Sequence, residues 1–262
     1  MYEVSAHLEA LFTERRDSSA DPIGTQVYAA AEHHVPAVEI LWWRNKDLER
    51  LSAALTQTGI DLQTMGVDPI ISLVDPASHD SFITALEQSA QAAHNLNCPY
   101  LVISAGEVLD DATRPVQHQA VADVLHRAVP VLEPTGRTLL LENLNSRVDH
   151  VGTYLDSTAE CLDIVDEVNS PRVKVLYDLY HSITMGERPE QVLDGRVDRV
   201  AHVQIADTPG RHEPGTGTID WASELTTLRK LGYEGRIGLE YIPTTETPRS
   251  FAYIRSVIAD LG

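Results

Sequence analysis

The chain has 262 residues, enough for one large hydrophobic core or two small ones, and its apolar content is ordinary for a globular protein. Its formal net charge of −19 makes an acidic surface that repels nucleic-acid backbones and anionic lipids. No apolar run approaches the roughly 18 residues of a membrane helix. From the charge and the absence of such a run together, we expect neither nucleic acid nor membrane as a partner.

Short apolar segments alternate with helical patterns along the whole chain. Several are near-continuous apolar runs, which is typical of parallel strands covered on both faces. Eight segments are predicted to be strands: Val4–Leu8, Ala37–Trp42, Asp61–Val67, Tyr100–Ser104, Thr138–Glu142, Val173–Asp178, Val200–Ile205 and Ile237–Tyr241.

Helix signals fall between these segments. Four helix starts are predicted from capping residues and apolar spacing: Asp21 as N-cap with Pro22 at the first helical position, Ser78 before an apolar face, a capping box at Ser157–Glu160, and Thr247 with Pro248 before the last helix. Asp220 is a further plausible N-cap. The helical pattern is weaker in the segments 110–134 and 186–196.

Eight β/α units in this length predict a (β/α)8 TIM barrel. The rival doubly wound sheet usually has a glycine-rich phosphate turn after its first strand, and EALFTERR here has no such glycines. No linker or shift in composition is visible, so residues 1–262 are expected to form a single domain.

The two cysteines, Cys98 and Cys161, are far apart and form no CxxC motif. Each is interpreted as a small buried apolar residue, as suits a reducing compartment. The first residues show no basic stretch followed by an apolar one, the pattern of a signal peptide. We therefore expect a cytoplasmic protein.

The stretch from Val200 to Trp221 is the most informative. His202 and Gln204 lie two residues apart on a predicted strand, so they share one face. Buried polar side chains need partners. This strand therefore either has polar neighbours in the core or lines a site.

Oxygen-bearing side chains recur where the last four predicted strands end. They are spaced by 36, 26 and 36 residues: Glu142, Asp178, Gln204 and Glu240. In a barrel these ends meet at the mouth, where active sites lie. Three carboxylates would repel one another there unless a cation neutralised them, and oxygen ligands suit Mg²⁺ or Mn²⁺.

Each of these residues also has an ordinary structural explanation. A strand-end glutamate is often exposed or ion-paired, and Asp178 fits a helix N-cap. Gln204 fits a residue that satisfies a backbone group, and His181 fits a hydrogen-bonded core histidine. The matching depth of four residues favours one site over four coincidences.

Several segments resemble the hydroxypyruvate isomerases of the xylose-isomerase-like TIM-barrel superfamily. They are SAHLEALFTE at 5–14, ENLNSRVDHVGTYLD at 142–156, DLYH at 178–181 and HVQIADTPGRHEPGTGTIDW at 202–221. The resemblance covers essentially the whole chain and is strongest from residue 142 onward.

The resemblance implies roles for these residues. Glu142, Asp178, Gln204 and Glu240 would bind one divalent metal ion, with Glu142 and Glu240 also the acid/base pair. The related ketose 3-epimerases have histidine where this chain has Gln204, which favours the hydroxypyruvate isomerase branch. His181 and Arg211 would contact substrate oxygens. Two further substrate-binding candidates come from this chain itself: His7, near the expected pocket, and Arg147, which like Arg211 could hold a substrate carboxylate but alternatively pairs with Asp149 or Asp156.

Two positions depart from the pattern: His7 replaces an asparagine, and Asn143 replaces a proline. Both lie near the expected pocket and leave the identity of the substrate open. Trp42 and Trp43, after the second strand, either wall that pocket or are structural.

The expected activity is metal-dependent aldose–ketose isomerisation through an enediolate, most simply of hydroxypyruvate to tartronate semialdehyde. The close alternative is a ketose 3-epimerase or another sugar isomerase. Alternatives of other classes are a metal-dependent nuclease acting on abasic DNA and a binding subunit without turnover. By analogy with the family, association into a homo-oligomer is also expected.

Overall fold

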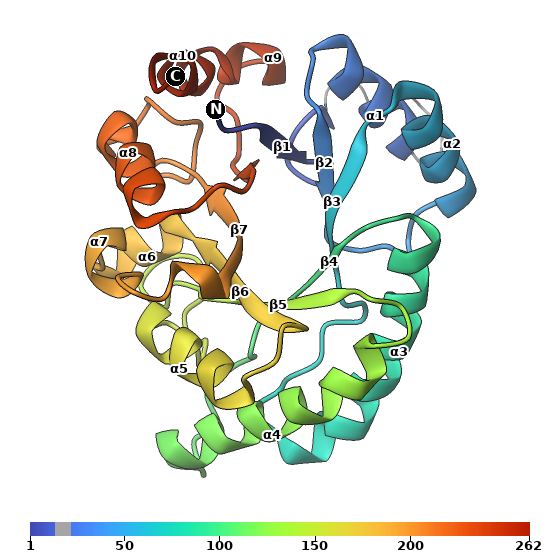
Figure 1. The fold of residues 1–262 in the computed structure, drawn as a ribbon, viewed down its shortest axis with the longest axis vertical. Coiled ribbons are helices and arrows are strands. Elements are labelled where there is room, and N and C mark those ends of the chain that lie inside the picture. The colour runs from blue at the N-terminus through green and yellow to red at the C-terminus, as the bar shows by residue number, and fades with distance from the viewer. Residues whose placement is uncertain (14–21) are drawn as a thin grey trace.

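The computed structural model describes residues 1–13 and 22–262. Eight parallel strands close into a barrel in sequence order (Figure 1). They are β1 (Val4–His7), β2 (Ala37–Ile40), β3 (Asp61–Gly66), β4 (Tyr100–Ile103), β5 (Thr138–Glu142), β6 (Val173–Asp178), β7 (Val200–Ile205) and β8 (Ile237–Leu239). The predicted (β/α)8 barrel is confirmed.

Helices surround the barrel (Figure 1). They are α1 (Ile23–Glu32), α2 (Leu48–Thr58), α3 (His79–Asn95), α4 (Arg114–Leu132), α5 (Thr158–Val168), α6 (Leu179–Met185), α7 (Pro189–Val192), α8 (Trp221–Leu231), α9 (Thr247–Ser250) and α10 (Ala252–Asp260), with short 3-10 turns η2 (Pro76–Ser78) and η3 (Val197–Arg199). No helix in the described ranges is both long and apolar enough to cross a membrane.

The strand predictions differ from the structure mainly at the carboxyl ends. β5, β6 and β7 have the predicted bounds, whereas β2 ends at Ile40 instead of Trp42. There the chain turns away from the ladder, and the backbone N–H of Trp42 donates to the Glu9 carboxylate. β8 ends at Leu239, so Glu240 is the first residue beyond it.

Capping side chains begin several helices as predicted. Ser157 accepts from the N–H of Glu160 at the start of α5, and Asp220 accepts from the N–H of Ser223 at α8. The other half of the predicted capping box differs. The Glu160 carboxylate accepts from the Tyr154 hydroxyl and the Arg114 guanidinium instead of from the backbone N–H of Ser157. Pro22 is the N-cap position of α1 and not its first residue, because α1 begins at Ile23; the predicted cap Asp21 lies outside the described residues.

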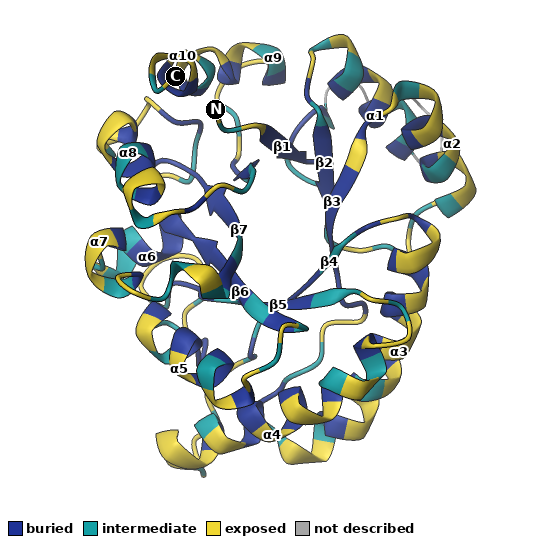
Figure 2. Cartoon of the chain, viewed as in Figure 1, coloured by how far each residue is buried: buried dark blue, intermediate teal, exposed yellow. Residues whose placement is uncertain are grey.

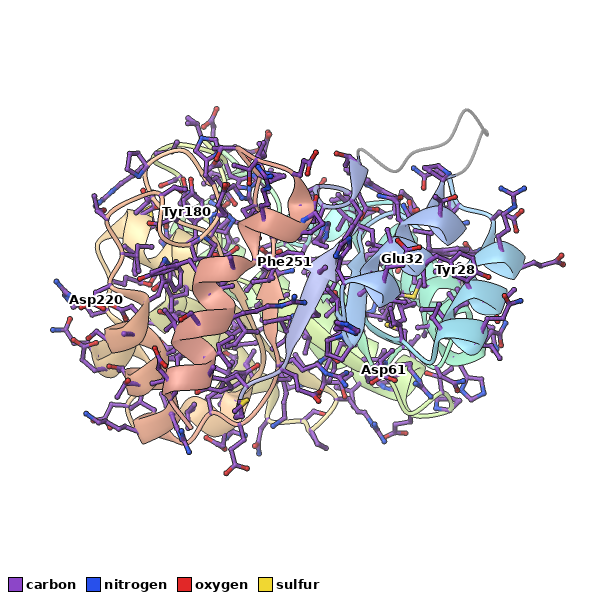
Figure 3. All side chains as sticks on the ribbon, turned by 90° about the horizontal axis from the view of Figure 1, so that it is seen from above. Tyr28, Glu32, Asp61, Tyr180, Asp220 and Phe251 are labelled. Carbon is purple, nitrogen blue, oxygen red and sulfur yellow. The ribbon has the colours of Figure 1, made fainter. Side chains whose placement is uncertain are left out.

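The largest apolar core lies between the helices and the outer face of the barrel. Figure 2 shows buried residues on the strands and on the helix sides that face them, and side chains fill the space between the ribbons in Figure 3. Cys98 and Cys161 are free and buried, as predicted. A second, small apolar cluster joins Val102, Leu140 and Leu176 of three successive strands.

Candidate functional site

The carboxyl ends of β5 and β6 bring three chemically active side chains together. Glu142 ends β5, Asp178 ends β6, and His181 lies in the first turn of α6. One nitrogen or oxygen atom of each lies within 4.8 Å of the others, a spacing that a metal ion can bridge. Two predicted ligands thus meet, with the predicted substrate contact His181 beside them.

Asp178 is held from two sides. Its Oδ1 caps α6 by accepting the N–H of His181 at 2.9 Å. The Asn143 side chain bonds the backbone of Asp178 reciprocally, accepting from its N–H and donating to its carbonyl oxygen, both at 3.2 Å. Asn143, which replaces the proline of the resembling family, therefore fixes the end of β6.

The electrostatics of Glu142 and Asp178 fit a bound cation. Burial raises the pKa of Glu142 well above its usual value, and the nearby Glu240 and Asp178 carboxylates raise it further. Burial also raises the pKa of Asp178 to about 7, with Glu240 adding to the effect and Arg211 opposing it. Crowded carboxylates of this kind are stabilised in their charged form by a divalent ion.

Asn145 determines which ring nitrogen of His181 carries the proton. The side-chain oxygen of Asn145 accepts from the N–H groups of Val148 and Asp149, so its amide nitrogen must face His181 Nδ1, at 2.6 Å. Burial lowers the pKa of His181 well below its usual value, with Arg211 and His150 contributing, so the ring is neutral. With Nδ1 accepting, the proton sits on Nε2, which has no hydrogen-bond partner among the described residues and lies 3.5 Å from Asp178 Oδ2. His181 therefore presents an N–H donor, which suits the predicted substrate contact better than metal ligation.

Gln204 is oriented by a carboxylate that the sequence analysis missed. Its amide nitrogen donates to Glu39 Oε2 at 2.9 Å, so its carbonyl oxygen turns away from Glu39. In the ladder Gln204 pairs with Asp178 on β6 and with Gly238 on β8. A side chain at Gly238 would collide with Glu39, His202 and Gln204, because a Cβ there would lie 2.5–2.8 Å from their atoms.

Glu39 is a fully buried carboxylate inside the barrel. Besides Gln204, it accepts from Ser5, from Thr64 at 2.9 Å and from His202 at 3.0 Å. Burial alone would raise its pKa, but His202 and the other donors lower it to about 2. His202 and Gln204 of β7 thus have a polar partner across the barrel. In the sequence, the one sign of this partner is the single Glu in the otherwise apolar run AVEI.

Glu240, the first residue after β8, is paired with the Arg211 guanidinium and lies near the His7 ring. Its Oε2 is 3.2 Å from Arg211 Nη2, and its Oε1 is 3.9 Å from His7 Nε2. The other ring nitrogen of the buried His7 is 3.6 Å from Glu9, which Lys46 also contacts at 2.6 Å. Burial opposes the charge of Arg211, but Glu240, Asp178 and Glu142 raise its pKa overall, so it stays cationic.

The loop from Asp207 to Asp220 places Arg211. The Asp207 carboxylate, which is buried, accepts from the N–H groups of Thr208, Gly215 and Ile219 and from the Trp221 indole. Arg211 has a left-handed backbone with φ 53°, an uncommon conformation for a non-glycine residue that recurs at functional sites. Its guanidinium lies over the Tyr180 ring, 5.6 Å from the centroid.

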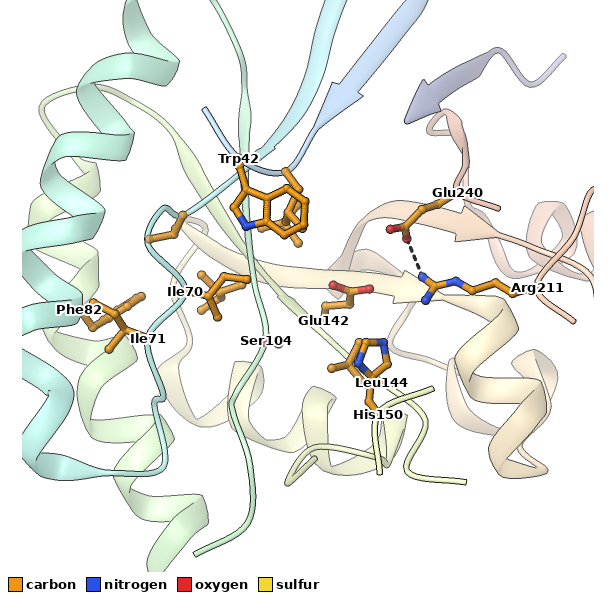
Figure 4. A pocket seen from close by; sticks show the side chains of 14 residues that line it. Trp42, Ile70, Ile71, Phe82, Ser104, Glu142, Leu144, His150, Arg211 and Glu240 are labelled. Atoms are coloured by element: carbon orange, nitrogen blue, oxygen red, sulfur yellow. Dashed lines mark ion pairs between the residues drawn. The ribbon is translucent and has the colours of Figure 1, made fainter. Parts of the chain in front are cut away.

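A cavity of about 390 Å³ opens at this mouth (Figure 4). Glu142, Glu240, Arg211 and His150 line one part of it. The rest is lined mainly by apolar residues: Leu41, Trp42, Val67, Ile70, Ile71, Phe82, Val102, Ile103 and Leu144, together with Ser104. Trp42 walls the cavity, whereas Trp43 is structural and donates to the Ser89 hydroxyl at 3.0 Å.

Arg147 lies apart from this cavity lining. It is exposed, and its guanidinium donates to the carbonyl oxygen of Thr184 at 3.1 Å in place of the alternative partners Asp149 and Asp156. Asn145, His150 and Asp207 are site residues that sequence reasoning missed. They lie inside the resembling segments, yet only the folded loops show what they contact.

Comparison with known proteins agrees with the barrel fold. The family model described as xylose isomerase-like TIM barrel matches residues 27–257. The chain belongs to this family. The predicted membership of the xylose isomerase-like TIM barrels is therefore confirmed.

Relatives within the xylose isomerase-like TIM barrels carry isomerase names. A Streptomyces coelicolor protein provisionally named a hydroxypyruvate isomerase is 30% identical over 271 residues, covering 95% of this chain and 94% of the relative. The 2-oxo-tetronate isomerase of Pectobacterium atrosepticum is 27% identical over 256 residues, covering 94% of each.

One similar solved structure is described as an AP endonuclease, family 2, from Brucella melitensis. It has a TM-score of 0.88 and 25% identity, covering 98% of this chain and 99% of that one. The 3-keto-D-glucoside 4-epimerase of Escherichia coli has a TM-score of 0.81 at 21% identity, covering 98% of this chain and 100% of that one, which indicates the shared fold.

Proposed function

We propose that the chain is a metal-dependent isomerase that moves a proton between adjacent carbons of a small hydroxy-carbonyl compound through an enediolate. One observation carries the proposal: Glu142 and Glu240 line the same cavity, beside a cluster of possible ligand atoms that suits a divalent ion. The isomerase names of the relatives support the same reaction class.

The residues that would hold the ion are Glu142, Asp178 and Glu240 through their carboxylates and Gln204 through its carbonyl oxygen. Mg²⁺ or Mn²⁺ suits this all-oxygen set. When bound, the ion would stabilise negative charge on the oxygens of the reacting carbons. Glu39 supports the set, since it holds the amide nitrogen of Gln204 at 2.9 Å.

The proton transfer is assigned to the two glutamates. One carboxylate takes a proton from the carbon that bears the hydroxyl, and the other delivers a proton to the neighbouring carbon. The Nε2–H of His181 and the guanidinium of Arg211 donate hydrogen bonds to substrate oxygens. General acid–base help of this kind typically contributes about 10²–10⁴-fold.

Hydroxypyruvate is the first substrate to test, because Arg211 can bind a carboxylate with two parallel hydrogen bonds. A ketose 3-epimerase would use the same carboxylates on a longer sugar, so only the substrate profile separates the two. Cleavage of abasic DNA is disfavoured, because Arg211 is the one Arg or Lys among the described residues that line the cavity, and it is paired with Glu240.

The decisive experiment is proton NMR of the purified protein in D₂O with Mg²⁺, using hydroxypyruvate in one tube and free ketoses in others. We expect tartronate semialdehyde to form with solvent deuterium at the carbon that receives the proton. Glu142→Gln and Glu240→Gln should each lose most of this turnover, about 10²-fold or more. Glu133→Gln, at the exposed residue that follows α4 and lies outside the cavity lining, should keep it.

Epimerisation of a ketose alone would move the assignment to a sugar epimerase. Near wild-type turnover in either site variant would remove that glutamate from the acid–base pair. Absence of turnover in every tube, with metal shown to be bound, would contradict the isomerase proposal for these substrates.

A further inference from the structure

The cavity has two chemically different ends. Glu142, Glu240 and Arg211 lie at one end, and in Figure 4 Trp42, Ile70, Ile71 and Phe82 lie at the other. The second end, here called the apolar arm, is built from the carboxyl ends of β2 and β4, the loop after β3, and α3. The arm opens directly from the place where the proposed proton transfer occurs.

The volume of the cavity exceeds what a three-carbon acid needs. At about 390 Å³ it lies within the range of pockets that enclose drug-sized ligands. Hydroxypyruvate would occupy the carboxylate end and leave the apolar arm to water. Water is poorly held there, because a buried water needs two to four polar partners.

The lining of the arm also disfavours a sugar chain. Among the described residues that line it, the Ser104 hydroxyl and the Trp42 indole N–H are the polar side-chain groups. Sugar hydroxyls placed against the other side chains would lose hydrogen bonds to water without replacement. An alkyl or aromatic group loses nothing there and gains from leaving water.

The exposed side chains of the arm also indicate an apolar ligand group. Trp42 is 41% exposed and Ile70 is 57% exposed, so two large apolar side chains at the cavity remain in contact with solvent. Apolar side chains gathered at a cavity typically mark a ligand site. A ligand group that entered the arm would cover them.

We propose that the substrate of this enzyme is a hydroxy-carbonyl compound that bears an apolar substituent of several carbons, which occupies the apolar arm. The proposal rests on the proposed isomerase function and names its substrate class. The simplest members are 1-hydroxyalkan-2-ones, which isomerise to 2-hydroxyalkanals. One proton leaves carbon 1 and one is delivered to carbon 2, the hydroxyl proton moves to the other oxygen, and no oxidant or reductant is needed.

Binding tests the arm independently of turnover. Straight-chain alkyl hydroxamates, from acetohydroxamate to octanohydroxamate, resemble the hydroxy-carbonyl head group and carry tails of increasing length. Calorimetry with the Mg²⁺-loaded protein should show affinity rising about fourfold per methylene until the arm is full. Affinity that stays flat or falls with length, or no binding at any length, would overturn the proposal.

Two substitutions of equally exposed residues provide the matched control. Ile70→Asn places an amide in the arm and should flatten the dependence of affinity on tail length. Val116→Asn, on α4 and also 57% exposed, lies outside the cavity lining and should leave that dependence unchanged. An equal effect of both substitutions would contradict a specific arm.

Turnover separates this proposal from the proposed function. Deuterium exchange at carbon 1 should be faster, in kcat/KM, for 1-hydroxyhexan-2-one than for 1-hydroxypropan-2-one by at least tenfold. Exchange of hydroxypyruvate without any gain from the alkyl chain would refute the arm and keep the isomerase. Hydroxamate affinity that grows with length, without exchange of any hydroxy ketone or of hydroxypyruvate, would keep the arm and refute the isomerase.

Discussion

At the scale of single residues, the site depends on side chains whose partners fix what they can donate or accept. Asn145 leaves His181 with its proton on Nε2, and Glu39 leaves Gln204 with its carbonyl oxygen turned away. We propose that these two supporting contacts give the side chains different roles: His181 is a hydrogen-bond donor to the substrate, and Gln204 is an oxygen ligand of the metal ion.

This difference in roles predicts different metal affinities for two variants. Gln204→Ala should weaken Mg²⁺ binding by about tenfold or more, since losing even a supporting contact of a ligand typically costs 10–100-fold. His181→Ala should keep the Mg²⁺ dissociation constant within about threefold and instead lose turnover. Calorimetric titration of both variants measures this. Equal loss of Mg²⁺ affinity in both would mean that His181 is itself a ligand.

The sequence marked the strand-end residues well, because their spacing follows the β/α repeat. It did not mark the role of Glu39, whose partners lie 34, 25, 163 and 165 residues away on three other strands. A hydrogen-bond network that crosses the barrel leaves no local pattern. Its members are identified only when the strands are placed around a common interior.

At the scale of elements, the loop between β7 and α8 is organised by one acid. Asp207 gathers backbone N–H groups from both arms of the loop and the indole at the start of α8. Gly217 is required beside it, because a Cβ there would lie 2.3 Å from Asp207 Oδ1. Arg211, within this loop, is therefore positioned in part by groups outside the cavity lining.

Asp207→Asn should test this organisation with almost no change in size. The amide nitrogen would face N–H donors, so we expect the free energy of unfolding to fall by about 2–4 kcal/mol. The KM of the substrate should also rise as Arg211 loses its position. Asp220→Asn is the control at the other end of the loop, since asparagine also caps helices well. Urea denaturation and steady-state kinetics would measure both effects, and equal stability of the two variants would contradict the role of Asp207.

Elements were predictable where a local rule governs them. The caps at Ser157, Asp178 and Asp220 all accept the N–H group that a cap should accept. The helix expected weakly at 110–134 is real as α4, whereas 186–196 holds only the short α7. Strand ends were less accurate, because side chains from distant loops, such as Glu9 near β2, decide where the chain turns.

At the scale of the whole molecule, a strongly acidic chain concentrates carboxylates at one mouth. The raised pKa values of Glu142 and Asp178 mean that the metal-free protein holds protons there near neutrality. In the folded protein the pKa of Asp178 is about 7, above its usual 3.8. Its protonation therefore contributes to the free energy of unfolding fully below about pH 3.8, and this contribution is lost as the pH rises through 7. A bound cation would replace those protons.

Mg²⁺ should therefore stabilise the protein more at pH 8 than at pH 6. With the ion at about a hundred times its dissociation constant, linkage predicts about 2.7 kcal/mol, or roughly 5–10 °C in Tm for a chain of this size. Thermal scans with Mg²⁺ or with chelator at both pH values would show it. Asp178→Asn keeps the helix cap and should reduce the pH dependence of the Tm shift caused by Mg²⁺. A larger Tm shift at pH 6 than at pH 8 in the wild type would contradict the assignment of the carboxylates as metal ligands.

The barrel itself was predictable because eight apolar segments and their spacing leave few alternatives. The apolar arm was not, since its side chains come from β2, β4, the loop after β3, and α3. Apart from Trp42, which was expected either to wall the pocket or to be structural, each looks like an ordinary core residue in the sequence. Only closure of the barrel shows that these side chains border an opening.

The carboxylate of Glu39 has a consequence for how the chain can be divided. Two of its donors, Ser5 and Thr64, come from the first quarter of the chain, and the other two, His202 and Gln204, come from the last third. A fragment that ended after β4 would enclose a charge with half of its donors missing, which is strongly unfavourable. Half-barrels of this protein are therefore poor independent folding units. During synthesis, the interior can become dry only after β7 has emerged.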